Sequence, residues 1–473
     1  MPFRVFAIRI QPVVMSLLLG GLTLFSTGCG KAPPPLEKVD AEPAPALAPA
    51  EQVLQRMVAT YRDAKSYSDQ AVVRLKYRQQ GQPLEDEGPF AVSLVRPNKL
   101  SLRAYQLTLL SDGRRLRAAI ADPGSNDMDG QIVVREVPST LGLDTIYEDQ
   151  LMLDVMSSGM GGPPVTLELL LSESPLTELL ASGKGVELLD EGKIGDRACD
   201  RVQLQLADGQ LVFWVDRQSH LLLRLEYPAD RLAREMAAGN CTDVSLTAEF
   251  VGARVNEKVA DEAFSFAVPQ SARTVSRFVL PPQPLSSELI GQLPGDFHFT
   301  DLTGELLTRD SLLGKIAVLV WFNDHPASQA ALADLERVRK TLPTEVPVAC
   351  YAVCTEPTSV SHAQVQSLAH RWGSTAPLVR DLEAFGRDVF KIPYAPTVVV
   401  LDRRGVVQLF EVGANPNLAS ELPDRLRLLV AGEDLAAGRL AQFRQEQTLY
   451  QKKLDESSRL APQDARASRG RLR

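Results

Sequence analysis

Two side chains with potential chemistry, His325 and Ser328, stand three residues apart in the stretch NDHPAS. The apolar run Val318–Phe322 precedes this stretch and an amphipathic pattern follows it, which predicts a turn between a buried strand and a helix. In such a turn a histidine could serve as a neutral base and a serine as a nucleophile. A lone His/Ser pair is nevertheless a loose signature of hydrolysis. Capping of the helix by Asp324 or Ser328, with a proline in its first turn, is the simpler interpretation.

The second candidate chemistry is that of two cysteines, Cys350 and Cys354, in the apolar stretch VPVACYAVC. Four residues of a strand span ~13 Å, whereas a disulfide needs Cα atoms within ~7 Å, so these two thiols are not expected to bond to each other. Cys354 ends a strand expected to run parallel to Val318–Phe322, which would bring it to the same edge of the sheet. We favour a buried, inert thiol over a reactive one.

Neither a metal site nor a nucleic-acid surface is indicated. The histidines His220, His298, His325, His362 and His370 show no ligand spacing beyond the isolated His362 and His370. The formal net charge is -8, and no basic stripe interleaved with aromatic residues is present. We therefore expect no metal, no cofactor and no nucleic-acid partner.

Residues 1–29 have the layout of an export signal, with Arg4 and Arg9 before the apolar run Val13–Phe25. This run is shorter than the ~20 residues that a spanning helix needs. It ends in Ser-Thr-Gly-Cys29, which resembles the lipobox of bacterial lipoproteins. The resemblance implies cleavage before Cys29, lipidation of its thiol, and a chain anchored to a membrane of the cell envelope and facing the periplasm. Ser26 stands where that family usually has leucine, which leaves cleavage by the ordinary signal peptidase open.

The expected localisation outside the cytoplasm changes the interpretation of Cys199 and Cys241. Thiols in the envelope tend to be oxidised. Both cysteines lie in strand-like segments of the same region, so we predict a disulfide between them, with Cys350 and Cys354 as the free thiols.

The length of 473 residues predicts two domains with connecting segments. After the signal comes a Pro/Ala-rich tether. A region of short alternating strands then indicates a mainly antiparallel half-barrel with helices, and a linker leads to a strand–helix pattern typical of an α/β domain. The polar C-terminal segment is expected to be a frayed helix and a loose tail. The expected divisions are residues 30–50 for the tether, 51–275 for the half-barrel, 276–291 for the linker, 292–433 for the α/β domain and 434–473 for the tail.

The half-barrel region resembles the lipoprotein carriers LolA and LolB. The order that carries the resemblance is a helix, then RPNKLSL, a Ser-Asp-Gly hairpin and VFWVDRQSHLLLRLEY. It implies a curved sheet that holds a lipid or another hydrophobic ligand. The Met- and Leu-rich stretch Ile146–Leu180 would then be a lid or an internal plug. An ordinary packed core is an equally good interpretation of the same apolar residues.

The C-terminal domain resembles the thioredoxin-like superfamily, in particular its TlpA/ResA and AhpC/TSA-related branches. LPGDFHFTDLTGELLTRDSLLGKIAVLVWF and PLVRDLEAFGRDVFKIPYAPTVVVLDRRGVVQLFEVG carry this resemblance. It implies that the family's Cys-x-x-Cys pair falls on His325-Pro326-Ala327-Ser328, which cannot form a disulfide. It also implies that Pro396 is the family's cis-proline, beside a peptide-docking surface.

Three functions follow as hypotheses. The first is a membrane-anchored lipoprotein that binds a hydrophobic ligand and docks an envelope protein on a redox-inactive thioredoxin-like domain, with no catalytic residues. The second is an envelope thiol oxidoreductase using Cys354 or a partner's cysteines. The third is a structural scaffold. The turn without cysteines favours the first over the second.

Overall fold

The structure is a computed structural model that describes residues 48–120, 128–237, 239–250, 252–342 and 347–462. It divides into two compact units, one of residues 1–281 with 453–473 and the other of residues 282–452. The expected export signal, Cys29 and most of the expected tether lie outside the described residues.

The first unit is built on one large sheet. Its strands are β1 (Ser66–Gln79), β2 (Gln82–Val95), β3 (Lys99–Ala104), β4 (Leu107–Asp112), β5 (Arg115–Ile120), β6 (Gln131–Glu136), β7 (Val186–Ile194), β8 (Arg197–Leu206), β9 (Gly209–Asp216), β10 (Leu222–Tyr227), β11 (Cys241–Phe250), β12 (Arg254–Val255) and β13 (Arg273–Val275). Their order is β13-β6-β5-β4-β3-β2-β1-β11-β10-β9-β8-β7, with β12 beside β1. All pairs are antiparallel except β13 with β6. Within the described residues the two end strands, β13 and β7, do not pair with each other, so the sheet is not a closed barrel.

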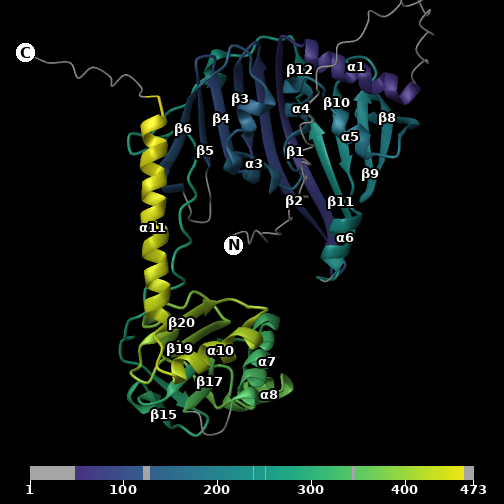
Figure 1. The fold of residues 1–473 in the computed structure, drawn as a ribbon. Coiled ribbons are helices and arrows are strands. Elements are labelled where there is room, and N and C mark those ends of the chain that lie inside the picture. The colour runs from purple at the N-terminus through teal and green to yellow at the C-terminus, as the bar shows by residue number, and fades with distance from the viewer. Residues whose placement is uncertain (1–47, 121–127, 238, 251, 343–346, 463–473) are drawn as a thin grey trace, which may run out of the picture. The chain divides into compact units, whose positions relative to one another are not determined.

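Short helices cover the sheet of this unit. They are α1 (Pro49–Asp63), α2 (Leu143–Tyr147), α3 (Gln150–Ser157), α4 (Val165–Leu171), α5 (Thr177–Ser182) and α6 (Asp230–Ala237), with 3₁₀ turns η1 (Met128–Gly130) and η2 (Asp261–Phe264). Figure 1 shows α3, α4 and α5 lying against the sheet. Met152, Met156 and Leu167 of these helices are fully buried, as are Leu100 and Leu102 of β3. A mainly antiparallel sheet with helices is therefore confirmed, whereas the lipoprotein-carrier architecture stays a prediction.

The predicted Cys199–Cys241 disulfide is wrong. Cys199 lies in β8 and Cys241 begins β11, and the strands β9 and β10 run between them. Neighbouring strands are ~4.8 Å apart, so three spacings exceed the ~7 Å that a disulfide allows between Cα atoms. Both thiols are free and buried. The order of the strands depends on long-range pairing, which the local pattern around each cysteine does not contain.

The second unit has a seven-stranded sheet in the described residues. Its elements are β14 (His298–Asp301), β15 (Leu306–Thr308), the 3₁₀ turn η3 (Asp310–Leu312), β16 (Ile316–Phe322), α7 (Pro326–Thr341), β17 (Val348–Cys354), α8 (His362–Arg371), β18 (Leu378–Arg380), α9 (Phe385–Asp388), β19 (Thr397–Leu401), β20 (Val407–Val412), α10 (Leu418–Val430) and α11 (Leu435–Leu460). The order is β15-β14-β18-β17-β16-β19-β20. β16, β17 and β18 are parallel, and β19 and β20 form the expected antiparallel hairpin. This is the sheet that the thioredoxin-like resemblance implies.

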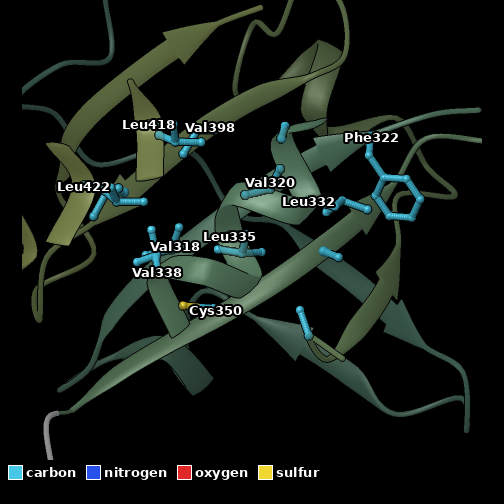
Figure 2. Packing of buried hydrophobic residues seen from close by; sticks show 14 of the residues in the cluster. Val318, Val320, Phe322, Leu332, Leu335, Val338, Cys350, Val398, Leu418 and Leu422 are labelled. Carbon is cyan, nitrogen blue, oxygen red and sulfur yellow. The ribbon is translucent and has the colours of Figure 1, made fainter. Parts of the chain in front are cut away.

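The strand β16 is buried on both faces because helices and loops cover the sheet on both sides. Val318 and Val320 pack against Leu332 and Leu335 of α7 and against Leu422 of α10, as Figure 2 shows. The alternate residues of the same strand pack on the other face, where Trp321 meets the aromatic rings of Phe299 and Phe390. A continuous apolar run is what a strand between two such layers requires. The end of β16, from which the following turn starts, is therefore fixed by packing on both faces.

Part of the expected linker is hydrogen-bonded to the end strand of the sheet in the second unit. The backbone of Gly291 and Gln292 forms hydrogen bonds with Val407, and the Ser286 hydroxyl donates to the Phe410 carbonyl. These contacts lie along β20, which is the end strand of the sheet. Ile290 is buried in the core on the same side. The linker therefore covers the free edge of β20.

Helix α11 is longer and better packed than the sequence pattern indicates. Residues up to 452 belong to the second unit and residues from 453 to the first. In the first unit Leu454 and Ser457 are buried, and Ser457 forms hydrogen bonds with the backbone of Ser276 and Arg277. The frayed helix expected from residue 442 is thus a regular helix to Leu460, because a few buried residues on one face suffice to hold it.

Candidate functional site

The candidate site is the turn between β16 and α7. β16 ends at Phe322 and α7 begins at Pro326, as the sequence predicts. His325 has extended backbone and is the N-cap of the helix: its Nδ1 accepts a hydrogen bond from the N–H of Ala327, with 3.1 Å between the nitrogens. Proline in the first turn costs the helix no hydrogen bond, because that N–H has no partner in any helix. The turn therefore follows from local residue types.

Ser328 closes the turn from inside. It is fully buried, and its hydroxyl donates to Asn323 Oδ1 at 3.0 Å while accepting from the Asn323 N–H at 3.3 Å. The sequence interpretation of Asp324 or Ser328 as the helix cap is therefore wrong. The Ser328 oxygen is held by Asn323, and the Asp324 N–H donates to Glu356 Oε1 at 2.8 Å. The Ser328 N–H donates to the His325 carbonyl at 2.9 Å, but the two side chains have other partners, so they do not form a base–nucleophile pair.

A second loop, residues 355–361 after β17, forms hydrogen bonds with the backbone of the turn. Besides the bond from Asp324 to Glu356, the N–H and hydroxyl of Thr355 both donate to the Phe322 carbonyl, at 2.9 and 3.1 Å. Sequence reasoning missed Glu356. The rule that placed Cys354 at this edge could have found it, because a residue two positions further along the chain emerges at the same edge.

Both cysteines of this unit are unsuited to redox chemistry. Cys354 pairs in register with Phe322 and is 0% exposed. Cys350 is buried on the same face of the strand. Burial raises the pKa of each thiol to about 11. Since the thiolate is the attacking species, burial and the raised pKa both oppose the reaction of these thiols at neutral pH.

The peptide bond between Ala395 and Pro396 is cis, as the resemblance implies. Thr397 pairs with Trp321 on β16, so Pro396 lies next in line beside Phe322. The Pro396 carbonyl accepts from the N–H of Gly413. The side chain of Tyr394 is 56% exposed two residues before the proline. The surface beside the turn thus carries an exposed aromatic ring, while Pro396 itself is buried and its carbonyl is bonded.

A metal centre is not formed by the described residues: no group of three or more His, Cys, Asp or Glu side chains there is arranged to hold an ion. Among those same residues no helix is long and apolar enough to cross a membrane.

Replacing Ser328 by alanine is expected to lower the free energy of unfolding of this unit by about 1–3 kcal/mol, because the N–H and the Oδ1 of the half-buried Asn323 both lose their partner. Chemical denaturation followed by the fluorescence of Trp321 and Trp372 measures it. Ser359→Ala, in the exposed part of the neighbouring loop, is the matched control and should change the value by less than about 0.5 kcal/mol. Equal effects of the two substitutions would contradict the role of Ser328.

No protein-family model matches the chain, and no curated protein matches it. Similarity is found to solved structures. The chain is similar over 30% of its length to 90% of a putative protein disulfide isomerase from Bacteroides thetaiotaomicron, with 20% identity and a TM-score of 0.27. It is similar over 30% of its length to 96% of a putative thiol:disulfide interchange protein from Chlorobium tepidum, with 15% identity and a TM-score of 0.27. It is also similar over 29% of its length to 96% of a secreted disulfide oxidoreductase from Mycobacterium tuberculosis, with 24% identity and a TM-score of 0.23. The second unit is thioredoxin-like in its strand order, in the helix that follows β16 and in the position of Pro396.

Proposed function

We propose that the second unit is a protein-docking domain that does not exchange thiols and disulfides. One observation carries the proposal: the turn holds His325 and Ser328, while the unit's cysteines, Cys350 and Cys354, are buried thiols with a pKa of about 11. A thiol with so high a pKa is protonated at pH 7, and burial keeps a substrate away from it. The frame for docking is retained without the reactive sulfurs.

The docking surface consists of the exposed residues of the turn, Asp324–Pro326, and the exposed Tyr394 beside Pro396. A peptide segment of a partner protein suits it, because the exposed Tyr394 offers an apolar contact with a polar tip beside the exposed residues of the turn. The thiol oxidoreductase hypothesis would need either Cys354 to leave the core or a partner that brings its own cysteines, and a pure scaffold would need no free surface at the turn. The proposed partner is an envelope protein, which the export-signal pattern of residues 1–29 and the lipobox-like Cys29 support, and the chain would be held at the membrane by a lipid on that cysteine.

The test uses the chain from residue 30 in a disulfide-reduction assay with dithiothreitol as the electron source. No rate above the uncatalysed one is expected. In intact cells, a photo-crosslinking residue at position 394 should trap an envelope protein, whereas one at the exposed Leu306 of β15 should not. Reductase activity that survives Cys354→Ser would refute the proposal, and so would equal crosslinking from positions 394 and 306.

A second candidate, binding of a hydrophobic ligand by the first unit, is favoured by the composition of its covering helices. Met152 and Met156 of α3 and Leu167, Leu169 and Leu170 of α4 are buried, and the two helices are joined through Gly161 and Gly162. Methionine adapts to varied apolar shapes, and a glycine-rich connection permits movement. A ligand would enter by displacing these helices from the sheet.

We expect the chain from residue 30 to take up an environment-sensitive apolar dye and to release it when a long-chain fatty acid is added. Fluorescence titration measures both steps. A signal equal to that of a ligand-free globular protein would contradict ligand binding.

A further inference from the structure

A buried cation lies beneath the docking surface. Arg380, the last residue of β18, is 2% exposed and pairs in register with Cys354. Its guanidinium donates to three backbone carbonyls, those of Val360 at 2.8 Å, Glu356 at 3.0 Å and Pro357 at 2.8 Å. None of the ion pairs found in the described residues includes it.

Burying a guanidinium without a carboxylate partner is unfavourable unless hydrogen bonds to other groups offset the loss of its hydration. All three acceptors of Arg380 belong to one loop, residues 355–361, and the planar fork of arginine fixes their relative positions. The same loop carries Glu356, whose carboxylate accepts from the Asp324 N–H, and Thr355, which donates twice to the Phe322 carbonyl. A continuous set of hydrogen bonds thus runs from Arg380 through the loop to the turn.

We propose that Arg380 is the positioning residue of the docking surface and that the loop of residues 355–361 is part of that surface. Arg380 fixes the conformation of the loop, and the loop fixes the backbone conformation of the turn through the hydrogen bonds of Glu356 and Thr355. The turn thereby keeps one shape with neither a disulfide nor a bound metal. This inference rests on the proposed docking function, but the coupling between Arg380 and the turn can be measured without any partner.

The test is amide hydrogen exchange of the chain from residue 30, followed in peptides covering residues 323–328 and 355–361. Arg380→Lys retains the charge but not the three-way fork, and should speed exchange in both peptides by about tenfold, while peptides of β16 and β19 stay unchanged. Glu356→Ala should speed exchange in 323–328. Glu356→Gln is the matched control: it retains an oxygen acceptor for the Asp324 N–H and should leave that peptide near wild type.

Two results would overturn the inference. One is faster exchange in 355–361 with no change in 323–328, which would separate Arg380 from the turn. The other is an equal increase in all peptides of the unit, which would make Arg380 a general stabiliser. If Arg380→Lys does not fold, the contrast between Glu356→Ala and Glu356→Gln decides the coupling. Crosslinking at position 394 should also fall in Arg380→Lys; its absence in the wild type would count against docking itself and not against the coupling.

Discussion

Cysteine at both positions 325 and 328 is expected to turn this protein into a disulfide reductase. The N-terminus of α7 lies at residue 325, where exposed N–H groups and the helix dipole stabilise a thiolate and lower its pKa. A second thiol three residues along the helix is close enough to close a disulfide. The rate with dithiothreitol as the electron source should rise clearly above the uncatalysed rate, at which the wild-type chain is expected to stay.

The activity should be partial, because the carboxylates of Asp324 and Glu356 lie near the new thiol and favour its protonated form. Adding Glu356→Gln removes one charge but retains the oxygen that accepts from Asp324, so the rate at neutral pH should increase further. The single variants His325→Cys and Ser328→Cys are the controls and should not turn over. If mass spectrometry shows the new disulfide but the rate stays at background, the placement of the site is wrong.

The second large effect concerns a buried carboxyl group in the first unit. Asp69 of β1 is 4% exposed. Its Oδ2 accepts from the Tyr67 hydroxyl at 3.2 Å, and its Oδ1 is buried without a hydrogen-bond partner in the described residues. Burial raises the pKa of Asp69 to about 6, from an ordinary value near 3.8. The folded unit therefore holds this proton more tightly than the unfolded chain does.

Stability should consequently fall as the pH rises through this window. Between pH ~4 and ~6 the folded state binds more protons than the unfolded state, so the contribution of Asp69 decreases and then stays low. At pH 7.5 ionisation of Asp69 lowers the free energy of unfolding of the unit by about 2–3 kcal/mol. Asp69→Asn removes the charge, retains an acceptor for Tyr67, and should stabilise the unit by up to that amount at pH 7.5.

At pH 4 the gain from Asp69→Asn should shrink to less than about 1 kcal/mol. Scanning calorimetry of the chain from residue 30 at the two pH values measures the difference. Asp196→Asn makes the same change of charge at an exposed turn of the first unit and should give no such pH dependence. A gain from Asp69→Asn that is equal at both pH values would mean that packing, not ionisation, is responsible.

The parts of the site that the sequence predicts correctly are those set by neighbouring residues. The uninterrupted apolar run of β16, a proline in the first turn of α7 and the hairpin of β19 and β20 are local signals, and the site appears where they place it. Arg380, Glu356 and the bond between Ser328 and Asn323 escaped prediction because each depends on which segments meet at the edge of the sheet. The wrong Cys199–Cys241 disulfide has the same cause, since nothing near either cysteine indicates that two strands separate them.

The pairing of residues 286–292 with β20 has a consequence for solubility. An end strand with unpaired backbone groups is a template on which a second chain can add, and such addition leads to aggregates. Here the preceding segment occupies that position and also buries Ile290. A fragment that starts at residue 293 would expose both the strand edge and the core beneath it. The segment before β14 therefore protects the edge of β20 from pairing with a second chain, and a soluble fragment of the unit has to include this segment.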